Sequence, residues 1–531
     1  MMASWRFLGC TLFLTAVAAL HGAGGCTLAT APAATEPADT FATVAGGAVY
    51  VSAKAGAGDG DGSAARPLKS IQAAIAVADA LPRNGGGSST GPWVVLGAGD
   101  YAEAIVVPGG VSVTGSGSAG ATRILPPGGI GIRVSGAGRT FLRDLSVVGA
   151  VGSGIAVDTG GVTLSNVTVS GTKASGPKSG NGLDLSGVAF AEIQSCTIRD
   201  NAGIGVSAKG SGTVSIIDPL FHTDPRGQNA KDPGSVGIID PLFLPASNID
   251  HNQGGGVAII DPLFLPGDGV SLRIESSNIG ANQRFGVATL GGNVVIAGSA
   301  IHGIVAPDGD GLLIGAPSVA PKSALTVRVT GSIVTGNARA GVLLNGPATL
   351  DFQGECSANA HGGIWAQHAA AVVRTNVDAL IARNTAVGIA VSNGASLVVD
   401  GSRIADTQPL AYLPAGATVT VSAADGIGVY GQAHGKITGA RISGNPRAAV
   451  LAKGCAAKAD GSPDLDVTGC SISGSKWGVV VNGQYSQMAA VGAAPGNSYD
   501  GVDAEKQSNT QDLPAPESVC ADGQYTCGSG I

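Results

Sequence analysis

The feature that most constrains the fold is a short pattern, Asn-x-x-x-Gly followed by Ile or Val, which recurs along the chain. Its six complete copies begin at Asn201, Asn252, Asn282, Asn337, Asn359 and Asn384. A seventh, at Asn445, has Ala449 in place of the glycine. Successive copies start 51, 30, 55, 22, 25 and 61 residues apart, near one or two units of about 22–27 residues. Strands bounded this closely by Gly and Asn cannot return through tight hairpins at so long a period. Each unit is therefore predicted to form one turn of a coil and to pair with the units before and after it.

Stacked coils place equivalent residues over one another, about 4.8 Å apart. Inward Ile, Val and Leu side chains then form aliphatic columns, and the six asparagines are predicted to form a ladder of amide hydrogen bonds. Asn also tolerates the left-handed backbone of a sharp bend. Residues 93–500 correspond to about 15 such coils. The pattern therefore predicts one elongated, all-β solenoid.

The composition excludes other classes of protein. Of 531 residues, 86 are glycine, which helical bundles avoid because each interior glycine costs about 1 kcal/mol. With 44% hydrophobic residues the chain can bury a core. The net charge of −7 gives no electrostatic footprint for nucleic acid, so none is expected as a partner.

Residues 1–25 have the features of an export signal, because Arg6 precedes an apolar run shorter than the about 20 residues that span a membrane. The small residues before Cys26 resemble a bacterial lipoprotein processing site. This resemblance implies cleavage before Cys26, acylation of that cysteine and, with Thr27 after it, an outer-membrane or cell-surface location. Ordinary secretion is the alternative. Residues 26–47 are expected to be a flexible tether, with the lipid as the only membrane contact and the protein a monomer.

Residues 48–92 are predicted to cover the first coil, because an open end would expose unpaired strands. A strand at 49–52 is followed by an amphipathic helix at 68–80, which can plug the core. One face of this helix carries Ile71, Ala74, Ile75 and Ala78. Residues 501–531 are predicted to be a polar C-terminal tail.

The run YVSAKAGAGDGDGSAARPLKSIQAAIAVA (50–78), followed by VVLGAGDYAEAIVV, resembles the opening of the pectate-lyase-like superfamily of right-handed parallel β-helices. More narrowly, it resembles exported bacterial proteins with this strand–loop–Pro–helix cap and no assigned activity. The resemblance implies a right-handed parallel β-helix with a short N-terminal capping helix. It does not imply a reaction, because the superfamily includes lyases, hydrolases, epimerases, adhesins and inert scaffolds.

A hexapeptide, Ile-Ile-Asp-Pro-Leu-Phe, occurs three times at spacings of 22 and 21 residues. If these are single-coil steps, Asp218, Asp240 and Asp261 stack at one corner, where three carboxylates need a cation such as Ca²⁺ or a shared proton. No other cofactor is expected. The alternative is structural: Asp-Pro ends a strand, and a recent duplication explains the identity of the copies.

Two functions remain open on the sequence. The first is an envelope-anchored β-helix with a binding or structural role toward a polysaccharide or another envelope component. The second is a polysaccharide lyase or glycoside hydrolase that uses carboxylates near 218–261. Its candidate catalytic residues are Asp240, Asp261 and His251, which follows Asp250 at the asparagine corner. A solvated turn histidine is the alternative for His251.

The cysteines allow two interpretations in an exported protein. Local disulfides are plausible between Cys520 and Cys527 and between Cys455 and Cys470. Against the second pair, Cys470 occupies the same place before a strand as Cys196, and Cys356 is similar, which favours buried, unpaired thiols.

Overall fold

The computed structural model describes residues 41, 47–56, 60–82, 91–177, 179–210, 212–217, 247–260, 271–315, 325–412, 421–459, 463–482, 496–502 and 504–509. The chain divides into two units, Met1–Asp39 and Thr40–Ile531, and every element named below belongs to the second. The described residues contain one helix and 42 strands. No helix in this part of the chain has the length and apolar character needed to cross a membrane.

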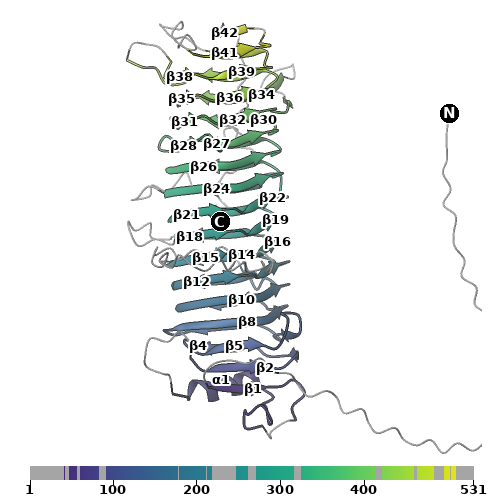
Figure 1. The fold of residues 1–531 in the computed structure, drawn as a ribbon. Coiled ribbons are helices and arrows are strands. Elements are labelled where there is room, and N and C mark those ends of the chain that lie inside the picture. The colour runs from purple at the N-terminus through teal and green to yellow at the C-terminus, as the bar shows by residue number, and fades with distance from the viewer. Residues whose placement is uncertain are drawn as a thin grey trace, which may run out of the picture. The chain divides into compact units, whose positions relative to one another are not determined.

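The strands form two sheets, and neighbouring strands in each belong to successive coils (Figure 1). Every pairing between named strands is parallel except that of β33 with β34, within the described residues. Without β33, the smaller sheet has 15 strands on its path. The predicted fold, a parallel β-helix of about 15 coils, is therefore confirmed.

The smaller sheet, called sheet C here, contains one strand from each coil. Its members are β4 (Ile105–Pro108), β7 (Ile132–Ser135), β9 (Ser153–Val157), β11 (Asn181–Ser186), β14 (Ile204–Lys209), β17 (Gly255–Ile260), β20 (Phe285–Thr289), β23 (Asp310–Ile314), β25 (Ala340–Leu344), β27 (Gly362–Ala366), β30 (Ala386–Val391), β34 (Val421–Tyr430), β37 (Ala448–Lys453), β40 (Trp477–Asn482) and β42 (Ala504–Asn509), with β33 (Leu410–Tyr412) beside β34.

The larger sheet, called sheet A, bends, so that most coils contribute a first strand and then a short second strand. The first strands are β1 (Ala48–Val51), β2 (Trp93–Leu96), β5 (Ser112–Gly115), β12 (Val188–Gln194), β15 (Thr213–Ile217), β18 (Ser271–Glu275), β21 (Asn293–Ala297), β28 (Val372–Thr375), β31 (Ser396–Asp400), β35 (His434–Thr438) and β38 (Leu465–Thr468). The short strands are β3 (Gly99–Tyr101), β6 (Thr122–Ile124), β13 (Thr197–Arg199), β16 (Asn248–Asp250), β19 (Asn278–Gly280), β22 (Ala300–His302), β29 (Leu380–Ala382), β32 (Arg403–Ala405), β36 (Arg441–Ser443), β39 (Ser471–Ser473) and β41 (Ser498–Asp500). Four strands run through the bend: β8 (Arg139–Val148), β10 (Gly160–Ser170), β24 (Leu325–Thr335) and β26 (Ala348–Ser357).

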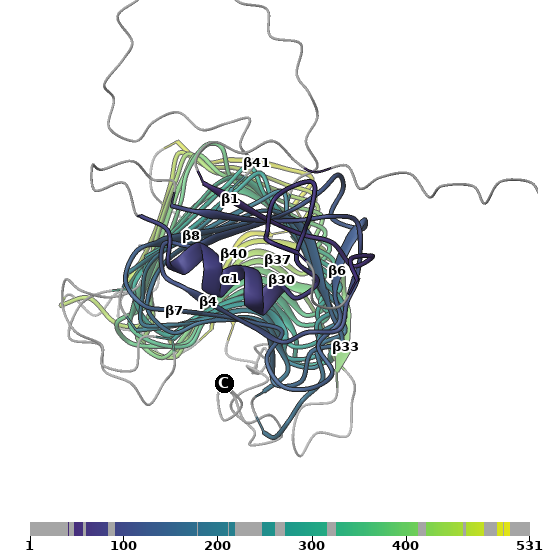
Figure 2. The ribbon, with the colours of Figure 1, turned by 90° about the horizontal axis from the view of Figure 1, so that it is seen from below.

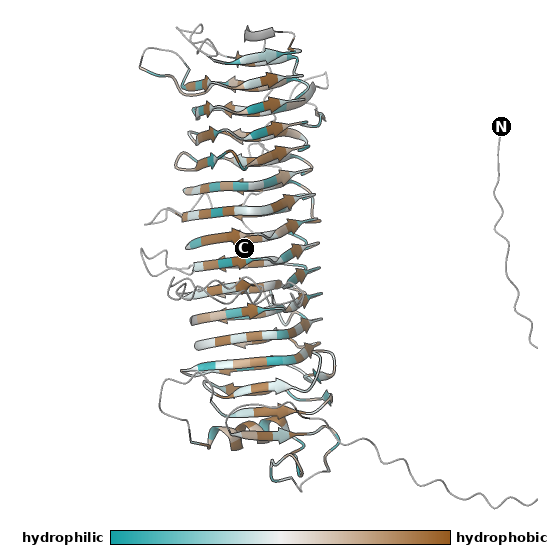
Figure 3. Ribbon diagram, in the orientation of Figure 1, coloured by the Kyte–Doolittle hydropathy of each residue, from teal (hydrophilic) through white to brown (hydrophobic). Residues whose placement is uncertain are grey.

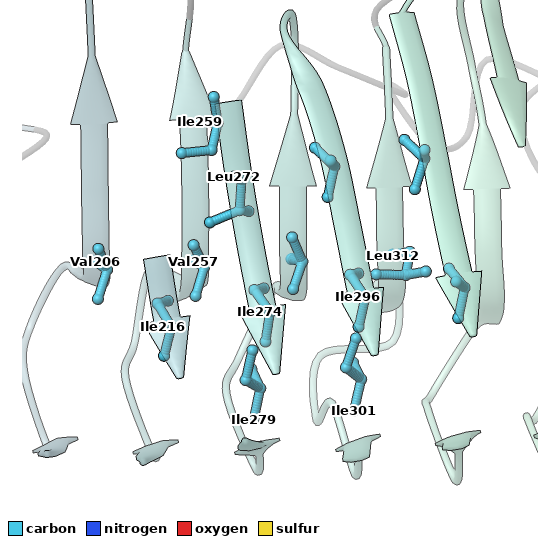
Figure 4. Close-up of a cluster of buried hydrophobic side chains, with 14 of the residues drawn as sticks. Val206, Ile216, Val257, Ile259, Leu272, Ile274, Ile279, Ile296, Ile301 and Leu312 are labelled. Carbon is cyan, nitrogen blue, oxygen red and sulfur yellow. The ribbon is translucent and has the colours of Figure 1, made fainter. Parts of the chain in front are cut away.

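The core lies between the two sheets and is built from columns of aliphatic side chains. Val206, Val257, Val287 and Leu312 pair in register on successive strands of sheet C. They face an equivalent column of isoleucines from sheet A (Figure 4). Apolar and polar residues alternate along many strands of sheet A, as expected for a sheet with one buried face (Figure 3). Burial of these columns stabilises the stack and fixes the register of each coil.

The six asparagines of the repeated pattern follow the end of the sheet A strand of their coil, which is β24 for Asn337, β26 for Asn359 and a short strand for the others, and all six are almost fully buried. Asn201, Asn252 and Asn282 form one run, in which Nδ2 donates to Oδ1 of the next asparagine at 2.9 and 3.0 Å. Asn337, Asn359 and Asn384 form a second run, with both distances 2.8 Å. Between the runs the equivalent position is Ile304, whose backbone N–H donates to Asn337 Oδ1 at 3.3 Å.

The single helix, α1 (Ile71–Asp79), lies across the first coils, as Figure 2 shows. It begins three residues later than predicted, because Ser70 is its N-cap and accepts a hydrogen bond from Ala73 N. The Glu103 carboxylate also accepts from Ile71 N and Gln72 N, which satisfies two further N–H groups of the first turn. The buried residues are the four predicted from their spacing, Ile71, Ala74, Ile75 and Ala78.

Candidate functional site

The outer face of the short strands carries a row of polar side chains across successive coils. Asn248 of β16 and Asn278 of β19 pair in register, and Asn278 Nδ2 donates to Asn248 Oδ1 at 2.6 Å. His302 of β22 adds to the row, with Nε2 2.7 Å from Asn278 Oδ1. An amide oxygen can only accept, so the ring carries a proton on Nε2. We call Asn248, Asp250, His251, Asn278 and His302 the polar row.

A glycine determines where the histidine ring lies. Asp250, Gly280 and His302 pair in register on β16, β19 and β22. A Cβ added to Gly280 would be 2.5 Å from Cε1 of His302, so the imidazole lies over the bare backbone of Gly280. The ring therefore occupies the space between the Asp250 and His302 positions. A side chain at residue 280 would exclude it.

Asp250 and His251 are in contact, although they are adjacent in sequence. His251 has a left-handed backbone with φ of 53°, which turns its side chain out of the strand alternation. Its Nδ1 is 3.4 Å from Asp250 Oδ2, and its side chain is 61% exposed. The other carboxylate oxygen, Asp250 Oδ1, is buried and has no hydrogen-bond partner in the described part of the chain. This oxygen can accept a hydrogen bond that the described residues do not supply.

A groove of about 540 Å³ continues this face beyond the polar row. It crosses β24, β26 and β29, and β22 pairs with β24, so the groove begins one coil after His302. Its volume lies within the range typical of small-ligand sites. Its lining includes Ile333, Gln353, Gly354, Glu355, Asp378 and Leu380.

Unequal bends explain the hollow. Three successive coils pair in register on both sides of this bend. Before the bend the paired residues are Val329, Phe352 and Thr375, and after it they are Ile333, Glu355 and Leu380. Three residues separate these positions in the coil of β24, two in that of β26 and four in that of β28 and β29. The middle coil is the shortest, so its bend at Gly354 lies recessed between two longer bends and forms the floor of the groove.

The family of this chain follows from the parallel coils together with a match of its sequence to a family model. The chain matches the family model of the right-handed beta helix region over residues 130–224 and 318–488, half of its length. It belongs to the right-handed β-helix family.

Solved structures similar to this β-helix show the fold alone. A pectate lyase, Pel9A, is 14% identical, with 61% of this chain and 75% of that chain covered and a TM-score of 0.33. The A-module of the Azotobacter vinelandii mannuronan C-5 epimerase AlgE4 is 17% identical, with 87% and 98% covered and a TM-score of 0.38. PfbA, a surface adhesin of Streptococcus pneumoniae, is 10% identical, with 88% and 94% covered and a TM-score of 0.24. No curated protein matches the sequence.

The three predicted aspartates, Asp218, Asp240 and Asp261, lie outside the described residues. The strands that precede two of them belong to different sheets. Ile217 ends β15, which pairs with β12 and β18 in sheet A. Ile260 ends β17, which pairs with β14 and β20 in sheet C. β15 and β17 lie in one coil with β16 between them, and the stacking of the three aspartates stays a prediction.

The predicted disulfide between Cys455 and Cys470 is not present. Cys470 is a buried free thiol, and its Sγ donates to the carbonyl oxygen of Thr468 at 3.4 Å. Cys196 and Cys470 do occupy matching positions directly before β13 and β39, whereas Cys356 lies within β26 in the core. Cys26, Cys520 and Cys527 lie outside the described residues.

Two buried ion pairs, which the sequence did not reveal, lie on the outer face of sheet C. Arg339 Nε donates to Asp310 Oδ1 at 2.9 Å, and Arg447 Nε to Asp425 Oδ1 at 2.8 Å. Burial raises the pKa of both carboxyl groups, although each guanidinium acts in the opposite direction. Their regular pairing with Arg and their burial mark them as structural. No group of three or more His, Cys, Asp or Glu residues in the described ranges is arranged to hold a metal ion.

Proposed function

We propose that this protein is an exported, envelope-anchored β-helix that binds an extended polysaccharide along the outer face of its short strands. The observation that carries the proposal is the polar row, which continues in register into the groove. Asn278 pairs with Ala300, and Ala300 with Ile333, whose column leads on to Glu355. A face whose successive rungs lie about 4.8 Å apart suits a linear polymer.

The chemistry of the face suits sugar hydroxyl groups. Amide and imidazole groups both donate and accept hydrogen bonds, as hydroxyl groups do, and a carboxylate accepts them. Asp250 Oδ1 provides a buried acceptor without a donor. Ile333, whose side chain is 43% exposed, offers an apolar surface beside these polar groups. Sites for small ligands combine such apolar area with a few polar groups that fix orientation.

The test is glycan binding by the full-length protein in detergent micelles. A glycan array identifies the ligand, and calorimetry gives the affinity. Asn278→Ala and His302→Ala are expected to weaken binding about tenfold, because each removes about 1.4 kcal/mol of hydrogen bonding. Ser443→Ala, on the same face of the distant strand β36, is the control. The proposed site would be excluded if Asn278→Ala, His302→Ala and Ser443→Ala bound the glycan with equal affinity. It would also be excluded if the wild-type protein bound no glycan.

The envelope anchor is proposed from the sequence around Cys26. Acylation of Cys26 would place the β-helix on the membrane through residues 26–47, which are expected to act as a tether. Cys26→Ser should move the protein from the membrane fraction to the soluble fraction in its exporting host. Membrane association of this variant at the wild-type level would contradict acylation there.

Catalysis is the second candidate function, and the contact between His251 Nδ1 and Asp250 Oδ2 favours it. A carboxylate beside an imidazole orients the ring, as a general base requires. Each glycan that binds should therefore be incubated with the protein, with Ca²⁺ or with EDTA, and examined for new reducing ends or unsaturated products. Product formation by the wild-type protein that is lost in His251→Ala, Asp240→Ala or Asp261→Ala would establish an enzyme. If the glycan stays intact in every condition, the catalytic function is rejected and the binding function is retained.

A further inference from the structure

The groove beyond the polar row has a charge that restricts its ligand. Among the residues that the structure describes, its lining contains the carboxylates of Glu355 and Asp378 and no Lys or Arg. Arg383 approaches only from beside the groove, with Nη2 3.4 Å from Glu355 Oε1 and a side chain that is 57% exposed. Asp378 has no ion-pair partner in the described ranges. The groove is therefore acidic.

Apolar groups lie between these carboxylates. The Ile333 side chain is 43% exposed, and Leu380, which follows it in register through Glu355, is partly exposed. Gln353 adds an amide to the lining. The groove thus has an apolar surface between two carboxylates. A ligand that fits it has an apolar ring face and a positively charged substituent and carries no negative charge.

Glu355 is held in place for such a ligand. Ser357 Oγ donates to Glu355 Oε1 at 2.6 Å, which fixes the carboxylate from within its own strand. The same oxygen faces Arg383, so Oε2 is the atom left for a donor from the groove. A carboxylate that is positioned before binding loses little conformational entropy on binding.

We propose that the groove is a subsite for an amino sugar with a free, protonated amino group, in a polysaccharide that also contacts the polar row. The inference rests on the proposed function and names the class of its ligand. An ammonium group would donate to Glu355 and Asp378, while Ile333 and Leu380 would contact the sugar ring. A uronate would place a third negative charge beside the two carboxylates, which repel it.

The experiment compares three oligosaccharides of equal length on the full-length protein: glucosamine with free amino groups, its fully N-acetylated form, and a uronate. Calorimetry at low ionic strength should show the free amine binding at least about tenfold more tightly than either of the others. Added salt should reduce that preference, because the groove is open to solvent.

Glu355→Gln and Asp378→Asn should each lower the affinity for the free amine several-fold and leave that for the acetylated form unchanged. Asp351→Asn is the matched control, since Asp351 already faces Arg328 and Arg374 on sheet A, outside the groove. An unchanged affinity for the free amine in both groove variants would overturn the proposal.

A variant that fills the groove provides an independent check. A Cβ added to Gly331 meets nothing within 4 Å, and its φ of 54° is one that Asn166, at the same bend of an earlier coil, already adopts. Gly331→Asn should therefore fold normally and bind the amine more weakly. Equal binding of all three sugars would overturn the amine preference while glycan binding stands, whereas no binding of any glycan would overturn the proposed function itself.

Discussion

Gly256 lies against the side-chain amide of Asn282 in the next coil. A Cβ on Gly256 would be 2.9 Å from Asn282 Nδ2 and 2.4 Å from the carbonyl oxygen of Gly286. The same approach recurs at Gly205 toward Asn252 and at Gly341 toward Asn359. Where the following coil has an asparagine at the equivalent position, the glycine is thus required by that amide, whereas Gly286 and Gly388 lie against the backbone carbonyl oxygens of Gly311 and Gly426. The exception, Ala449, precedes a coil whose equivalent position is Ser475, where no amide stands.

Gly256→Ala should lower the free energy of unfolding by about 1–3 kcal/mol, because the added methyl forces the Asn282 amide and a backbone carbonyl to move. The measurement is the midpoint of urea unfolding, followed by circular dichroism. Gly120→Ala is the control, since a Cβ there meets nothing within 4 Å. Equal effects of the two substitutions would contradict this explanation of the pattern.

The interruption of the ladder at Ile304 predicts a tolerated polar substitution in a buried place. Ile304 is 2% exposed and lies between Asn282 and Asn337 in the column of asparagines. The preceding coil has a glycine, Gly286, at the position where a side chain would collide with an amide at residue 304. Ile304→Asn should therefore change the free energy of unfolding by less than about 1 kcal/mol, since the new amide joins both runs. Ile301→Asn, at a fully buried core position three residues earlier, should cost about 3 kcal/mol or more. The two thermal midpoints would separate these outcomes, and equal losses would show that the ladder cannot be extended.

The ion pair between Arg339 and Asp310 predicts a stability loss that grows with pH. Arg339→Met leaves a buried carboxylate without its partner, which costs about 3–5 kcal/mol when that group is charged. Burial already raises the pKa of Asp310, and loss of the guanidinium raises it further. A carboxyl whose pKa is raised in the folded state contributes stability below its unfolded pKa, about 4, and loses it as the pH rises through the folded value.

Urea unfolding of Arg339→Met should therefore show a small deficit near pH 4 and a larger one at neutral pH. The double variant Arg339→Met/Asp310→Asn carries no charge at either position, so its deficit should not depend on pH in this range. A deficit of Arg339→Met that falls as the pH rises would contradict the raised pKa of Asp310.

The buried cysteines predict thiols that do not react in the folded protein. Burial raises the pKa of Cys196 to about 12 and raises those of Cys356 and Cys470 as well. Since the thiolate is the reactive species, iodoacetamide at neutral pH should leave these three sites unmodified until the protein unfolds. Peptide mapping before and after urea treatment tests this. Modification of Cys196 in the native protein at the rate of a free thiol would show that its site opens.

The sequence predicted the repeat well because the same physical demand acts on every coil. The asparagines bond their neighbours, and the glycines leave room for an amide or a backbone carbonyl of the next coil, so both residues recur visibly. Aligning the copies on their asparagines also places Asn248, Asn278, Ile333 and Glu355 in one column, four residues before each asparagine. That alignment was the available signal for the groove and the polar row.

Other parts of the site could not be read in this way. His302 belongs to the coil where Ile304 replaces the asparagine, so the pattern passes over it. The depth of the groove depends on a difference of one or two residues between bends, which no residue type marks. The repeated hexapeptides suggested a period of one coil, but the strands that precede the first and third copies, β15 and β17, belong to different sheets.

The long segment between β15 and β16 shows how such a chain can change. Both strands keep their register with β12 and β13 on one side and with β18 and β19 on the other. Each strand is positioned by the rungs above and below it, so added residues at a corner do not disturb the rest of the ladder. New surface can therefore be acquired one corner at a time, and a lineage of these proteins is free to alter what it recognises while its framework stays the same.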